Sequence, residues 1–284
     1  MARAHQSDFK RDVNRAVRKA GPYIEKIARF GIASKGITYL ILGGIAVLAA
    51  VGAGHKTAST GGMLQLLIGR PLGWTVFTIL ALGFLAFGIW QWLRAFRDPE
   101  FEGSDWKGLR KRFAYFWAGL VNFVLVGVAI RILMIGPNRD VSGDRKAQNW
   151  AATALHYPLG RWALAGVGIG MVIYGGACAY RAWKMESDDE LPVSELSESA
   201  RNFACWMGKF GITARGLVFA LIGVFLVLAG WHQSPGEAKG QGGVLTELEH
   251  HQYGTIMLSV VAAGLIAYGL YALVLAWYRR IRTR

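Results

Sequence analysis

The sequence predicts an all-α membrane protein, with six transmembrane helices arranged as three parallel two-helix repeats around a pseudo-threefold axis along the membrane normal. Three observations carry this prediction. Six long apolar runs follow one another, one short motif opens every odd-numbered run, and positive charge collects in alternate connections. Only 18% of the 284 residues are charged, against about 25% in typical soluble domains.

The six apolar runs are long enough to cross a bilayer. A hydrocarbon core of roughly 30 Å needs about 20 helical residues, and a helix pairs its own backbone groups as lipid requires. A soluble bundle would show a polar face on each helix, which the run from Leu80 to Trp90 lacks. We therefore expect spans at 34–53, 74–93, 114–135, 162–183, 212–231 and 255–278.

The distribution of lysine and arginine orients these spans. The two termini and the connections after the second and fourth helices carry 22 of them, and the other three connections carry 6. The positive-inside rule then places both termini in the cytoplasm, as in a multi-pass protein of the inner (plasma) membrane. The net charge of +14 is explained by this arrangement, so nucleic acid is not an expected partner.

The segments outside the spans also have recognisable patterns. Residues 1–26 form a basic stretch whose amphipathic helix, ended by Gly21-Pro22, either lies on anionic lipid or is a solvated tail. Repeat 1 covers 27–97 and repeat 2 covers 106–184. An acidic linker follows at 185–200, with an amphipathic helix after Leu191-Pro192 that runs into the fifth span. Repeat 3 and a basic tail occupy 201–284.

The motif that opens each odd-numbered helix is a basic residue, a phenylalanine and, after five more residues, a glycine. The motif glycines are Gly36, Gly119 and Gly216. Each even-numbered helix carries two glycines five residues apart: Gly83 and Gly88, Gly170 and Gly175, Gly264 and Gly269. Five residues turn a helix by about 500°, so the two glycines lie on different faces. We expect each even-numbered helix to pack closely against two neighbours.

These motifs, with the openings Pro71-Leu-Gly, Pro158-Leu-Gly and Gln252-Tyr-Gly of the second helices, resemble the domain-of-unknown-function family 1206. Members of that family are bacterial membrane proteins built from three copies of a transmembrane helix pair. The third opening departs from Pro-Leu-Gly but keeps the spacing. The resemblance implies an integral membrane protein and brings no activity, substrate or catalytic residue.

Four polar residues in the spans are candidates for binding a ligand or a lipid headgroup. Lys35 and Arg215 precede the motif glycines of the first and third repeats, where the second repeat has Ala118. They form either an anion site on the pseudo-axis or snorkelling contacts with lipid phosphate. Arg131, in the third helix, is either functional or an interface anchor. Asn122 is mid-helix and typical of interhelical hydrogen bonding.

The sequence carries no pattern of an enzyme. Phosphate-binding loops, nucleophile elbows and zinc-protease motifs are absent, and histidines such as His55, His156, His232, His250 and His251 lack metal-ligand spacing. We therefore expect no catalytic residue, metal or cofactor. The expected function is structural, in assembly or in binding lipid headgroups, partner membrane proteins or a second copy of the chain. The alternative is a channel or facilitative transporter for a small, possibly anionic solute along the pseudo-axis.

Overall fold

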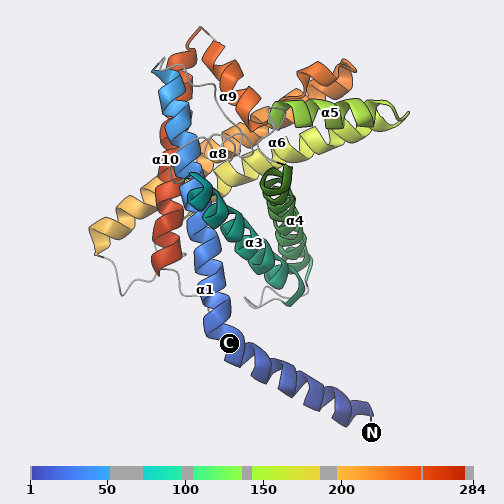
Figure 1. The fold of residues 1–284 in the computed structure, drawn as a ribbon, viewed down its shortest axis with the longest axis vertical. Helices are drawn as coiled ribbons and strands as arrows, with labels where there is room; N and C mark the ends of the chain where they lie inside the picture. Colours follow the sequence, from blue (N-terminus) through green and yellow to red (C-terminus); the bar gives the residue numbers. More distant parts are fainter. Residues whose placement is uncertain are drawn as a thin grey trace.

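The computed structural model describes residues 2–51, 73–97, 105–135, 143–185, 197–250 and 252–278. Six long helices form the body of the molecule (Figure 1): α1 (Ala2–Ala50), α3 (Gly73–Arg97), α4 (Trp106–Ile135), α6 (Gly160–Lys184), α8 (Glu198–Trp231) and α10 (Gly254–Tyr278). Each contains a stretch long and apolar enough to cross a membrane. The prediction of six spans in an all-α fold is confirmed. His55, His251 and most of the acidic linker lie outside the described residues.

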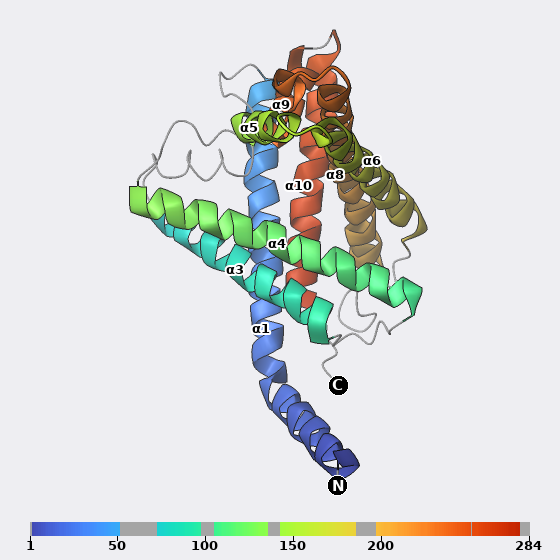
Figure 2. The ribbon, with the colours of Figure 1, turned by 90° about the vertical axis from the view of Figure 1, so that its right-hand side faces the viewer.

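The first helix differs from the expectation. Gly21 and Pro22 lie inside α1, which runs unbroken from Ala2 to Ala50, so the prediction that they end a separate helix is wrong. An interior proline removes one backbone hydrogen bond and bends a helix without having to end it when good helix formers follow. Figures 1 and 2 show α1 bending in its N-terminal part.

The fifth predicted span is the later part of α8, which begins earlier in the chain, at Glu198, so the prediction of a helix that runs into this span is confirmed from Glu198 onward. Leu191-Pro192 and the four residues after them lie outside the described residues. Ser197 caps α8, its side-chain oxygen accepting a hydrogen bond from the backbone N–H of Ala200 at 3.3 Å. Serine at this position satisfies one of the free N–H groups of the first turn. The helix then runs without interruption to Trp231.

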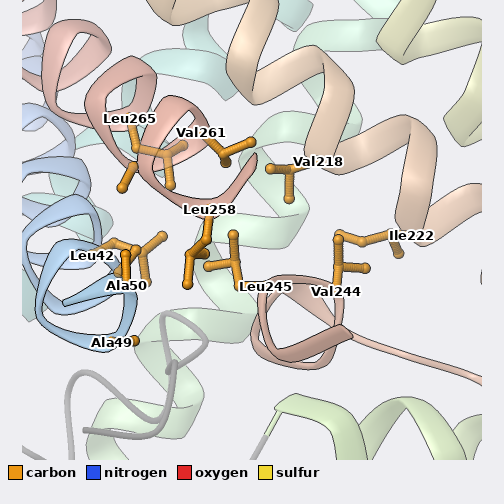
Figure 3. Packing of buried hydrophobic residues seen from close by; sticks show 12 residues of the cluster. Leu42, Ala49, Ala50, Val218, Ile222, Val244, Leu245, Leu258, Val261 and Leu265 are labelled. Atoms are coloured by element: carbon orange, nitrogen blue, oxygen red, sulfur yellow. The ribbon is translucent and has the colours of Figure 1, made fainter. Parts of the chain in front are cut away.

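Short helices that were not predicted from the sequence occupy the connection between α4 and α6 and the connection between α8 and α10. They are α5 (Gly143–Leu155), η1 (Pro235–Glu237) and α9 (Gln241–His250). They cover the ends of the spans. Val244 and Leu245 of α9 are fully buried, as is Ala151 of α5. Figure 3 shows the apolar cluster in which Val244 and Leu245 meet Leu42 of α1, Ile222 of α8 and residues of α10.

The six long helices associate as three pairs, each made by the second helix of one repeat and the first helix of the next. The pairs are α3 with α4, α6 with α8, and α10 with α1, and they form the most extensive interfaces of the molecule. Because the third repeat packs on the first, the order is cyclic, as a pseudo-threefold arrangement requires. Figures 1 and 2 show the α3–α4 pair crossing the α1–α10 pair obliquely.

Candidate functional site: a cationic and aromatic cluster

Glycine holds each of the three helix pairs close together. An ideal Cβ atom on Gly36 would lie 2.9 Å from the carbonyl oxygen of Gly269, and one on Gly216 would lie 2.8 Å from that of Gly175. A Cβ atom on Gly119 would lie 3.2 Å from the carbonyl oxygen of Gly88. The motif glycine of one repeat thus meets the second glycine of the preceding repeat in all three pairs.

These crossings determine where the candidate cations lie. Lys35 and Arg215 each precede a motif glycine, and Phe87, Tyr174 and Tyr268 each precede the second glycine of an even-numbered helix. Where two helices cross at a pair of glycines, the residue before the glycine of one helix lies near the residue before the glycine of the other. The cyclic pairing therefore gathers cations and aromatic rings from different repeats into one place.

Lys35 and Arg215 meet at Tyr268, which is buried. The Lys35 Nζ atom lies 5.5 Å from the centroid of the Tyr268 ring and 4.9 Å from that of Phe87. The Arg215 Cζ atom lies 5.3 Å from the same Tyr268 ring, and Nη1 donates a hydrogen bond to its hydroxyl at 3.2 Å. One tyrosine of α10 is therefore shared by a cation of α1 and a cation of α8.

Arg215 is the centre of the cluster. Its Nη2 atom donates to the Tyr174 hydroxyl at 2.9 Å, and its guanidinium lies 5.2 Å from the Phe219 ring and 5.8 Å from the Tyr39 ring. Tyr39 in turn packs edge-on against Tyr268, with ring centroids 4.7 Å apart. The Nε atom of Arg215 is buried and has no hydrogen-bond partner. The buried Nε–H group is thus a donor that the cluster leaves unused.

The two cations have no acidic counterpart in the part of the chain that the structure describes. Ion pairs there join Arg29 to Glu25 at 2.8 Å, His232 to Glu237 at 2.9 Å, and Lys239 to Glu247. Described carboxylates pair with neither Lys35 nor Arg215. Aromatic faces and hydroxyl groups supply their partners instead, so the cluster carries two positive charges.

The other two candidate residues lie apart from the cluster. Asn122 donates a hydrogen bond from Nδ2 to the carbonyl oxygen of Ala118 in its own helix at 2.7 Å. Its Cβ atom also lies 3.5 Å from the position that a side chain on Gly88 would occupy. Arg131 is exposed on α4 and bonds to no described residue. The second repeat, which has Ala118 at the equivalent position, adds no cation to the cluster.

The two motif arginines have local partners: Arg29 pairs with Glu25, and Arg112 bonds to the helix before it. Arg112 donates from Nε to the carbonyl oxygen of Ala95 at 2.7 Å and from Nη2 to that of Phe96 at 3.2 Å, both in the last turn of α3. Cations stabilise the free carbonyl groups at a helix C-terminus. In the second repeat the motif arginine therefore joins α4 to the helix before it.

The chain matches the family described as Domain of Unknown Function (DUF1206) in three segments, residues 30–98, 113–185 and 210–279. The chain belongs to the DUF1206 family. Uncharacterized protein YxxB of Bacillus subtilis (strain 168) is 28% identical over 260 residues, which covers 92% of this chain and 93% of that protein. No solved structure matches.

All three DUF1206 segments contribute to the cluster. The first supplies Lys35, Tyr39 and Phe87, the second supplies Tyr174, and the third supplies Arg215, Phe219 and Tyr268. The tyrosines of the cluster had no predicted role. The sequence pattern that could have revealed them is the aromatic residue before the second glycine in each DUF1206 segment. Elsewhere among the described residues, no group of three or more His, Cys, Asp or Glu side chains is placed to hold a metal ion.

Proposed function

We propose that this protein is a non-catalytic protein of the inner membrane, with both termini in the cytoplasm, that binds a phosphate-bearing anion at Lys35 and Arg215. One observation carries the proposal. Two partly buried cations from different repeats share the buried Tyr268, and no described carboxylate pairs with either. A charge costs about 2.5 kcal/mol at the centre of a membrane-spanning helix and less toward the helix ends, where these two cations lie. An anion between them would offset that cost.

The aromatic partners alone compensate only part of this charge. A cation over an aromatic face gains about 0.5 to 2 kcal/mol, and the two cations repel each other across Tyr268. Neither ring nor hydroxyl carries the formal negative charge that would cancel this repulsion. A phosphate group would do so, and it would also accept a hydrogen bond from the unused Nε donor of Arg215.

The surroundings favour a bound headgroup over an anion passing through the protein. From the level of Lys35 and Arg215 toward α9, the space between α1, α8 and α10 is filled by apolar side chains, including Leu42, Val218 and Leu265 (Figure 3). Crossing them would strip an anion of water without replacing its hydrogen bonds. The site is therefore better suited to hold an anion at one side of the bilayer.

Binding to the purified protein tests the proposal. Native mass spectrometry with phosphatidylglycerol, phosphatidylcholine and inorganic phosphate distinguishes a lipid headgroup from a free anion. Charged hydrogen bonds contribute about 1.5 to 3 kcal/mol, so we expect Arg215→Gln to weaken anion binding about tenfold or more. Lys35→Gln should weaken it as well.

Arg131→Gln is the matched control, since it removes the same charge from an exposed position in a span. We expect it to leave binding at the cluster unchanged. If Arg131→Gln and Arg215→Gln weakened anion binding equally, the effect would be a general one of net charge, and the site would be refuted. Preference for phosphatidylglycerol over inorganic phosphate would identify the source of the anion as a lipid.

A further inference from the structure

In one of the three repeats the two long helices do not pack on each other, so that this repeat is open. Within the first repeat Gly83 faces Ser34, and within the third Gly264 faces Ala214, so that α3 packs on α1 and α10 packs on α8. In the second repeat the equivalent Gly170 has nothing within 4 Å of an ideal Cβ atom. Over their described residues, α4 and α6 do not form the interface that would complete the pattern. The prediction that each even-numbered helix packs against two neighbours therefore holds for α3 and α10 and is wrong for α6.

The amino-acid sequence explains why this repeat stays open. An ideal Cβ atom on Gly31 would lie 2.7 Å from the Cα atom of Phe87, and one on Gly211 would lie 2.4 Å from the backbone nitrogen of Tyr268. The second repeat has Ala114 at this position. Its Cβ atom would collide in the same way with the backbone of Tyr174 if α4 packed on α6.

A second residue keeps the two helices apart. Trp117 stands where the other repeats have Ser34 and Ala214, the small residues that face the first glycine of the even-numbered helix. An indole does not fit in the space that a hydroxymethyl or methyl group fills. Trp117 is half exposed. Two substitutions in one repeat thus exclude the closed packing of the other two.

The opening reaches the cationic and aromatic cluster. Gly166, Gly170 and Tyr174 follow one another at four-residue steps along one face of α6. Tyr174 is 38% exposed, whereas the equivalent Phe87 and Tyr268 are 9% and 8% exposed in the closed repeats. The Tyr174 hydroxyl accepts a hydrogen bond from Arg215. The guanidinium therefore lies directly behind a side chain that the opening exposes.

The faces that the missing interface leaves uncovered are apolar. On α4 they include Val121 and Val124, which follow Trp117 at helical spacing and are both exposed. On α6, Val167 is exposed, although its equivalents Leu80 and Val261 are buried in the closed repeats. Apolar walls with two cations at the inner end fit an amphipathic anion that lies partly in the bilayer.

We propose that the opening between α4 and α6 is a lateral portal through which an anionic phospholipid enters from the bilayer. Its acyl chains lie against the uncovered faces of α4 and α6, and its phosphate passes Tyr174 to reach Arg215 and Lys35. This inference rests on the proposed anion site and adds the lipid as ligand and the route by which it arrives. The charge of the cluster selects an acidic lipid over a neutral one.

The first experiment closes the portal. Ala114→Gly combined with Trp117→Ala gives the second repeat the small residues of the other two. Spin labels at Leu109→Cys and Trp183→Cys, in a Cys178→Ala, Cys205→Ala background, report the distance between α4 and α6 in nanodiscs containing phosphatidylglycerol. We expect a shorter distance and about tenfold weaker retention of phosphatidylglycerol, with Lys35 and Arg215 unchanged.

The second experiment blocks the portal without requiring α4 and α6 to move together. Gly170→Trp places an indole in the open space before Tyr174, and we expect it to weaken binding of phosphatidylglycerol about tenfold. The matched control is Gly176→Trp, since Gly176 also has nothing within 4 Å but lies on another face of α6. The control should bind as the unaltered protein does.

The outcomes separate the portal from the anion site. If Gly170→Trp and the double variant bound phosphatidylglycerol as the unaltered protein does while Arg215→Gln lost binding, the result would support the anion site and overturn the portal. Full binding by Arg215→Gln would overturn both. Efficient disulfide cross-linking of two chains through Gly170→Cys would show that a second copy covers the opening, and would overturn the lipid as its occupant.

Discussion

Gly175 and Gly176 are neighbours on α6 with opposite surroundings. An ideal Cβ atom on Gly175 would lie 2.4 Å from the carbonyl oxygen of Gly216, whereas one on Gly176 meets nothing within 4 Å. We expect Gly175→Ala to lower the free energy of unfolding by about 1 to 3 kcal/mol, the usual cost of overpacking. Gly176→Ala should leave it unchanged or slightly higher, because alanine favours helix. Thermal unfolding of both variants in one detergent measures the difference, and equal melting temperatures would contradict the close crossing.

Gln233 adopts a backbone conformation that suits glycine. Its φ angle is 53°, and it follows His232 at the C-terminal end of α8, where the Ser234 N–H donates to the carbonyl oxygen of Ala229 at 3.1 Å. Glycine is preferred at this position because the left-handed region costs other residues roughly 1 to 2 kcal/mol. We expect Gln233→Gly to raise the melting temperature. Gln233→Ala is the control, and an equal gain from it would refute the explanation.

At the scale of the element, the short helix α9 stabilises the spans that it covers. Leu245 is fully buried in the cluster with Leu42 and Leu258, whereas Glu247 lies on the exposed side of α9 and pairs with Lys239. Leu245→Ala should cost about 2 to 5 kcal/mol, because it leaves a cavity. Glu247→Ala should cost no more than about 1 kcal/mol. Chemical unfolding of both variants compares the costs, and similar values would mean that α9 is only loosely attached.

The same element shows what the sequence predicts well and what it does not. The six spans are predictable because apolar length alone determines whether a helix can cross lipid. Helix α9 has only 10 residues, with two glycines among the first three, and helices this short depend on packing for their stability. Its burial against α1 and α10 is a tertiary contact that no local pattern indicates. The prediction that Gly21-Pro22 ends the basic N-terminal helix was wrong because the residues on either side continue α1 through the bend.

At the scale of the whole molecule, the candidate site was predictable in part. Comparing the repeats identifies Lys35 and Arg215 as cations at equivalent positions, but only the cyclic order of the helix pairs brings both to Tyr268. The aromatic partners come from helices far apart in the sequence, so spacing does not reveal them. Ala114 and Trp117 become informative once the contacts of Gly31 and Ser34 are known. Departures from the repeat therefore indicate function only when the geometry of the regular copies is available.

The orientation of the whole molecule gives the last prediction. Because 22 lysine and arginine residues lie on one side of the six spans and 6 on the other, the positive-inside rule places the start of α8 in the cytoplasm and the start of α10 outside. Ser199 and Tyr253 are exposed near these two ends. In a Cys178→Ala, Cys205→Ala background, Tyr253→Cys should react with a membrane-impermeant maleimide on intact spheroplasts, and Ser199→Cys only after permeabilisation. The reverse pattern would place Lys35 and Arg215 near the outer leaflet, so that the lipid they bind would have to come from that side.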